Sequence, residues 1–358
     1  MISGCAKIPV RDLFASCPRT PDEQSDVTWI PDVAHPVGSA FVDVPAADDH
    51  RAMRIYYPAA VAGRLPVATG AARFVADGPP PPILRVCLTR WPIVVFLHGG
   101  FGFDPGSTTR HQRFRRIGAT LAKSGYVAVF PSHAGSNAFS NADVDALRRD
   151  LAFVRTGWDR SHAVSQSANF MLAGHSNGAL QSFHLARRMP EVAALAALSG
   201  EFNYYPDLTA FYSDLRIPKL FMWARGLRAE DLAGFRGAFK GPTWTVDFEG
   251  QHFDYLNTAD TGNALRGPCT HIGALAADLT ALFAAANFVS RTPVPLDLSP
   301  PQVSLSTVQS SYAGDHLQHQ AQVRTSTGCG MFIRWSVEGE TGCRYVGSFP
   351  PAPCPTAP

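Results

Sequence analysis

The chain has 358 residues, of which 46% are hydrophobic and 17% are charged, and its formal net charge at pH 7 is +2. A chain of this size can bury one large core and a small second module. The near-neutral charge and the lack of a basic run or stripe argue against a nucleic-acid partner. The sequence has no apolar stretch of about 18 residues, so it predicts no transmembrane segment.

The first 34 residues contain several prolines and little periodicity, which predicts a tail or linker. Residues 1–6 (MISGCA) resemble the end of a bacterial lipoprotein signal, which implies a lipid anchor at Cys5. No charged and apolar leader precedes them, so a chance likeness is the alternative. Without Cys5, six of the seven cysteines remain, an even number that suits disulfides in an exported protein, whereas buried thiols would suit a cytosolic one. We favour export to the periplasm, cell envelope or exterior over a cytoplasmic location.

An alternation of apolar runs and helical patterns begins near residue 91. The run at 91–97 is typical of a strand buried on both faces, and it ends in the sequence HGGFG at 98–102. A helical segment at 110–124 and a second apolar run at 126–130 follow. Alternating strands and helices predict a mostly parallel sheet.

Residues 174–178 (GHSNG) match the pattern G-x-S-x-G, between an apolar run and a helical stretch at 179–188. Such a match is weak alone, but strand, motif and helix here come in the order that a nucleophile elbow requires. The chemistry needs a serine on a tight strand-to-helix turn, and glycines two residues to either side allow that turn. The alternative is a glycine-rich turn with a solvated serine.

Further short strands are predicted at 193–198, 219–224 and 243–248, and His252 follows the last of them. A closing helix is predicted at 272–289. Beyond Pro293 the sequence becomes polar with alternating short strands, which indicates a β-rich extension over 293–358. This extension faintly resembles part of an immunoglobulin-like module, and a segment that packs on the preceding domain is the alternative. The catalytic domain would then span 35–292.

Several segments together resemble the α/β-hydrolase superfamily over residues 40–289. They are 53–59 (MRIYYPA), 95–99 (VFLHG), 121–127 (LAKSGYV), 150–154 (DLAFV) and the elbow. The resemblance is to the lid-poor branch that holds platelet-activating-factor acetylhydrolases, dienelactone-hydrolase-like proteins and bacterial cutinases or polyester hydrolases. It implies an α/β fold with a mostly parallel central sheet and helices on both faces.

The resemblance also implies the site residues. Ser176 would be the nucleophile and His252 the general base, in the order serine, acid, histidine. The backbone N–H groups of Asn177 and of Gly100 or Phe101 would form the oxyanion hole. Three other histidines compete with His252 for the role of base: His133, His175 and His271.

The acid departs from the family's pattern. In most of the superfamily it follows the strand at 219–224, but here no carboxylate occurs until Glu230 and Asp231. The acetylhydrolase branch places it one strand earlier, where this chain has Glu201. We favour Glu201 over Asp231, because a carboxylate in the first turn of a helix is often only a partner for the helix dipole.

These features predict a serine-dependent hydrolase that cleaves small or polymeric carboxylic esters through an acyl-enzyme. The alternatives are a non-catalytic, hydrolase-like binding protein and a peptidase or amidase with the same triad. The sequence shows no zinc-type pairing of Cys and His and no phosphate-binding loop, so no cofactor is expected.

Overall fold

A computed structural model describes most of the predicted domain. The described residues are 36–45, 51–59, 90–99, 114–132, 141–199, 214–224, 243–248, 252, 272–284, 288, 303–313, 316–325, 331–337 and 340–346. The strands are β1 (Val37–Val44), β2 (Arg51–Pro58), β3 (Ile93–Leu97), β4 (Val127–Pro131), β5 (Phe170–His175), β6 (Val192–Leu198), β7 (Lys219–Ala224), β8 (Thr243–Phe248), β9 (Val303–Ala313), β10 (His316–Thr325), β11 (Met331–Val337) and β12 (Glu340–Val346). The α-helices are α1 (Arg115–Lys123), α2 (Asn141–Ala152), α3 (Asn177–Arg188) and α6 (Ile272–Ala284).

The main sheet has the strand order β1-β2-β4-β3-β5-β6-β7-β8-β11-β12. The strands from β4 to β8 in this order pair in parallel, and the strands at both edges pair antiparallel. The prediction of a mostly parallel central sheet is therefore confirmed. The predicted strands at 91–97, 126–130, 193–198, 219–224 and 243–248 correspond to β3, β4, β6, β7 and β8.

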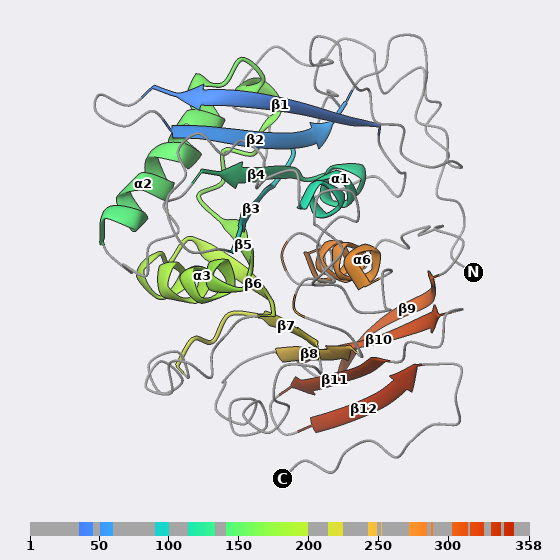
Figure 1. The fold of residues 1–358 in the computed structure, drawn as a ribbon. Helices are drawn as coiled ribbons and strands as arrows, with labels where there is room; N and C mark the ends of the chain where they lie inside the picture. Colours follow the sequence, from blue (N-terminus) through green and yellow to red (C-terminus); the bar gives the residue numbers. More distant parts are fainter. Residues whose placement is uncertain are drawn as a thin grey trace, which may run out of the picture.

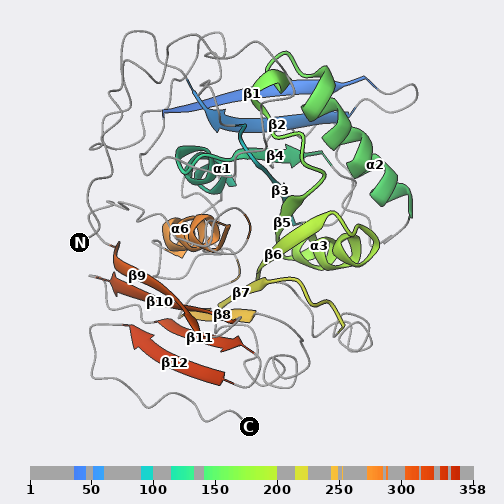
Figure 2. The ribbon, with the colours of Figure 1, turned by 180° about the vertical axis from the view of Figure 1, so that it is seen from behind.

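The central strands are apolar along their whole length because both faces of the sheet are covered. Every residue of β3, β4 and β5 is buried. Figures 1 and 2 show α1 and α6 on one side of the sheet and α2 and α3 on the other. Each side has its own hydrophobic core, so alternate residues of a strand enter different cores: Phe96 lies in the same core as Ile117 of α1, whereas Val95 lies in the same core as Phe183 of α3.

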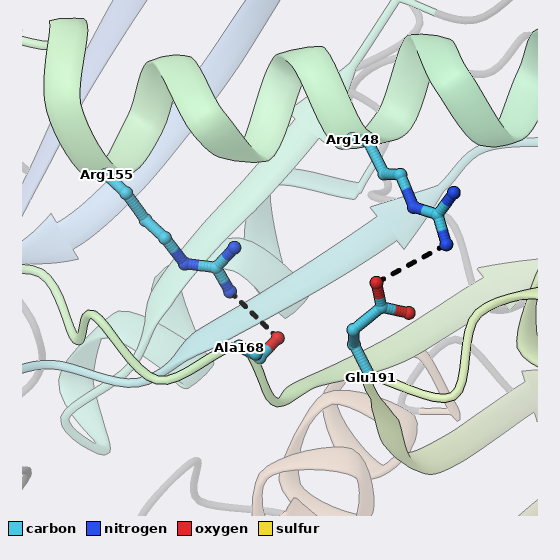
Figure 3. Close-up of polar contacts among 4 residues, drawn as sticks. All are labelled: Arg148, Arg155, Ala168 and Glu191. Carbon is cyan, nitrogen blue, oxygen red and sulfur yellow. Dashed lines mark hydrogen bonds and ion pairs between the residues drawn. The ribbon is translucent and has the colours of Figure 1, made fainter.

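Helix α2 continues into a π-helical turn, η4 (Phe153–Gly157), and both contact the segments that lead into β5 and β6. Arg155 donates a hydrogen bond to the carbonyl of Ala168 at 3.1 Å, and Arg148 pairs with Glu191 at 3.4 Å (Figure 3). Exposed pairs of this kind contribute at most about 1 kcal/mol. They hold α2 and η4 over the amino ends of these strands, whereas the elbow lies at the carboxyl end of β5.

The carboxy-terminal extension divides between two sheets. β11 pairs with β8 and β12 pairs with β11, so both strands continue the main sheet, whereas β9 and β10 form a two-stranded sheet of their own. The immunoglobulin-like interpretation and the domain boundaries stay predictions. Among the described helices, none has the length and apolar character needed to span a membrane.

Candidate active site

Ser176 lies at a strained turn between β5 and α3. Its φ is 56° and its ψ is −125°, which are rare values for a residue with a side chain. Gly174 and Gly178 make the turn sterically feasible: a Cβ on Gly174 would clash with the carbonyl of Gly178, and one on Gly178 would clash with the carbonyl of Leu97. The predicted strand, turn and helix are all present, with the serine at the turn.

The segment after β3 passes close to this turn. A Cβ on Gly99 would lie 2.6 Å from the Cβ of Ser176 and 2.8 Å from the carbonyl oxygen of His175, so a side chain here would displace the elbow. Asn177 begins α3, where backbone N–H groups have no partner within the helix. Gly100 and Phe101, which follow Gly99 directly, lie outside the described residues.

The end of β6 carries a second strained serine. Ser199 has a φ of 48°, and among the described non-glycine residues only Ser176 shares a positive φ with it. Register pairs His175 with Leu198, so the two serines follow directly after paired residues of adjacent parallel strands. The N–H of Ser176 donates to the carbonyl of Leu198 at 2.9 Å, and the N–H of Ser199 donates to the carbonyl of Met222 at 2.7 Å. Backbone strain of this kind concentrates at functional sites.

His252 meets the end of the sheet through both its side chain and its backbone. Its Nδ1 lies 2.8 Å from the Oγ of Ser199. Its backbone carbonyl accepts a hydrogen bond of 2.9 Å from Nε2 of His175, and the two imidazole rings lie 4.7 Å apart between centroids. His175 in turn contacts the ring of Phe114, with 5.3 Å between centroids. The histidine predicted to be the general base therefore lies beside the elbow.

Burial keeps both imidazoles neutral. Desolvation lowers the pKa of His252 from 6.5 to about 4. The pKa of His175 is also well below its ordinary value, because the ring is buried and a charged His252 would repel it. Neutral His175 must donate through Nε2–H to satisfy the carbonyl of His252, while neutral His252 is able to accept a proton.

The remaining predicted residues lie outside the described part of the chain: Gly100, Phe101, His133, Glu201, Glu230, Asp231 and His271. Ser199 was not identified as a site residue from the sequence. The available signal was a hydroxyl side chain directly after a parallel strand next to the elbow strand. Within the described residues, no group of three or more His, Cys, Asp and Glu side chains could hold a metal ion.

No protein-family model and no curated protein matches this sequence. Among solved structures, the protein is similar to a ferulic acid esterase from Streptomyces cinnamoneus, with a TM-score of 0.51 and 18% sequence identity. The similarity covers 77% of this chain and 97% of that chain. The fold is that of the α/β hydrolases. In an α/β hydrolase the nucleophile elbow follows a central parallel strand, as Ser176 follows β5 here. The expected membership of the lid-poor branch stays a prediction.

Proposed function

We propose that the protein is a serine hydrolase that cleaves carboxylic esters through an acyl-enzyme. Ser176 is the nucleophile and His252 the general base in this proposal. The backbone N–H groups of Asn177 and of Gly100 or Phe101 bind the developing oxyanion. The observation that carries the proposal is the proximity of two features: a serine with a positive φ at a strand-to-helix turn, and a partly buried imidazole that contacts the residue after the adjacent strand.

The chemistry runs in two halves. The Oγ of Ser176 attacks the ester carbonyl carbon while Nε2 of His252 takes the serine proton. The tetrahedral intermediate collapses, the bond to the alcohol oxygen breaks, and His252 returns the proton to the departing alcohol. Water then attacks the acyl-enzyme with His252 again as base, and this step releases the carboxylic acid and restores Ser176.

The geometry of His252 supports this division of roles. Its Nδ1 is within hydrogen-bond distance of Ser199, and in this proposal Nε2 is the ring nitrogen that takes the proton of Ser176. Adjacent strands of a sheet lie about 4.8 Å apart, and Ser176 and Ser199 are equivalent positions on two such strands. His252, which contacts Ser199, therefore lies at the same end of the sheet as Ser176.

The first test is labelling with a fluorophosphonate, followed by peptide mapping. We expect the label on Ser176. We expect the Ser176→Ala variant to take up no label and to turn over p-nitrophenyl esters about a thousandfold or more slowly. Ser167→Ala is a matched control, because Ser167 precedes the other end of the same strand and accepts a hydrogen bond from the N–H of Asn169. It should label and turn over like the wild type.

The substrate panel should separate the alternatives. Short and long acyl p-nitrophenyl esters, a polyester film, methyl ferulate and an anilide of matched acyl group compare chain length, polymer, feruloyl ester and amide. Methyl ferulate is included because the similar solved structure is a ferulic acid esterase. Labelling with turnover of the anilide alone would favour an amidase. The absence of both label and turnover would favour a non-catalytic binding protein.

A further inference from the structure

Ser199 is a buried hydroxyl at the position where a catalytic triad has its third member. Its side chain has no exposed surface, and its Oγ lies 2.8 Å from Nδ1 of His252. The third member of a triad contacts this same nitrogen and fixes the tautomer and orientation of the imidazole. We propose that Ser199 is a positioning residue that holds His252 with its proton on Nδ1 and its lone pair on Nε2. This inference rests on the proposed function, because that tautomer matters only if His252 accepts the proton of Ser176.

The direction of the hydrogen bond decides whether His252 can act as a base. If Nδ1–H donates to the Oγ of Ser199, Nε2 carries a lone pair and can take a proton from Ser176. If the hydroxyl of Ser199 donates to Nδ1 instead, the ring proton lies on Nε2 and blocks proton transfer. Proton transfer therefore requires the serine oxygen to be the acceptor in the resting state.

The backbone of Ser199 is itself held in place. Ser199 keeps its positive φ of 48° although it is not glycine, and its N–H is hydrogen-bonded to Met222 on β7. The backbone carbonyl of His252 is held separately by His175, so His252 is attached to the sheet once through its backbone and once through its ring. Two attachments from the ends of adjacent strands leave the ring little freedom to rotate.

Three substitutions separate the hydroxyl from the backbone strain. Ser199→Gly removes the hydroxyl and suits the positive φ, so a loss of activity cannot be ascribed to strain. Ser199→Asp places a carboxylate beside Nδ1, and Asp tolerates this backbone conformation better than most residues. Ser165→Ala is the matched control, because Ser165 is also a buried serine but lies before β5, at the opposite end of that strand.

The kinetic readout is the pH profile of kcat and KM with a p-nitrophenyl ester. We expect Ser199→Gly to lower kcat by about 10- to 100-fold with KM changed by less than about threefold. Ser199→Asp should recover part of that loss and move the acidic limb of the profile to higher pH, because a nearby negative charge favours the imidazolium. Ser165→Ala should match the wild type in kcat, in KM and in the pH of the acidic limb.

The readout that needs no turnover is the ¹⁵N NMR spectrum of protein labelled in its histidines, with the His252 signals assigned by their loss in His252→Gln. We expect a protonated Nδ1 and an unprotonated Nε2 in the wild type, and a mixture of tautomers in Ser199→Gly. A protonated Nε2 in the wild type, or an unchanged spectrum and pH profile in Ser199→Gly, would overturn the inference. If Ser176 neither labels nor matters for turnover, the proposed function fails, and the NMR result still decides whether Ser199 sets the tautomer.

Discussion

His175 donates a hydrogen bond of 2.9 Å from Nε2 to the backbone carbonyl of His252, so the residue before the proposed nucleophile holds the proposed base. The two imidazole rings also pack together. This contact links the turn at Ser176 to His252, which follows it by 76 positions in the sequence. The proposed nucleophile and the proposed base are therefore connected through His175.

Loss of the hydrogen bond at His175 should reduce activity more than stability. We expect His175→Phe, which keeps an aromatic ring against Phe114, to lower kcat/KM by about 10- to 100-fold because the backbone of His252 is no longer held in place. The rate of fluorophosphonate labelling measures this directly. His162→Phe is the control, since His162 is an exposed histidine of the 3₁₀ turn Ser161–Ala163. Equal labelling rates in both variants would contradict the role of His175.

A side chain at Gly99 should disrupt the elbow. A Cβ there would approach the Cβ of Ser176 to 2.6 Å, so we expect Gly99→Ala to lower the labelling rate of Ser176 by about a hundredfold or more. Gly38→Ala is the matched control, because its Cβ would approach the ring of Tyr57 to 2.5 Å, away from the site. It should lower the Tm and leave labelling at 20 °C unchanged. If both variants label normally, the tight approach at Gly99 has no role in the site.

The acidic limb of the kcat/KM profile should fall below pH 6.5. His252 acts only when neutral, and burial lowers its pKa to about 4, so the base form persists to lower pH than in an ordinary histidine. The measurement is kcat/KM between pH 3.5 and 8 from chromatographic quantification of the released acid. A limb above pH 6.5 would mean that a negative charge, rather than burial, dominates the environment of His252.

The two candidate acids should differ in effect. We expect Glu201→Gln to lower kcat by at least tenfold and Asp231→Asn to change it little, because Glu201 follows Ser199, the residue that contacts Nδ1 of His252, by two positions. The comparison of kcat for the two variants at pH 7 tests this. Equal small effects would mean that neither carboxylate assists His252.

The buried amine of Lys219 should make the free energy of unfolding depend on pH. The Nζ of Lys219 is buried and donates to the carbonyls of Leu215 and Ile217, and desolvation lowers its pKa from 10.5 to about 7. Between these values the unfolded chain binds a proton that the folded protein does not. The free energy of unfolding should therefore rise from pH 7 to pH 10.5, by an amount on the order of a few kcal/mol.

Urea unfolding of the wild type and of Lys219→Met at pH 7, 8.5 and 10 measures this dependence. The variant should lose most of the slope. Lys123→Met, at the end of α1, is the control on a partly exposed lysine and should keep the wild-type slope. If Lys219→Met keeps the wild-type slope of unfolding free energy against pH, other titrating groups cause that slope.

The sequence by itself determined the elements of the central sheet and the position of the elbow. Strands covered on both faces must be apolar throughout, so β3, β4 and β5 were evident as continuous hydrophobic runs. The glycines around Ser176 indicated the turn for a similar reason, because a tight strand-to-helix turn leaves no room for a Cβ at Gly174 or Gly178. Both are local requirements that leave a local pattern.

The tertiary structure decided what depends on contacts between distant segments. The pairing of β11 with β8 and the contacts of His252 with His175 and Ser199 join residues that are far apart in the chain. A hydroxyl that follows a strand has no pattern of its own, and it becomes a candidate site residue only because parallel pairing brings the ends of β5 and β6 together. The proposed role of Ser199 therefore follows from the fold and not from the sequence.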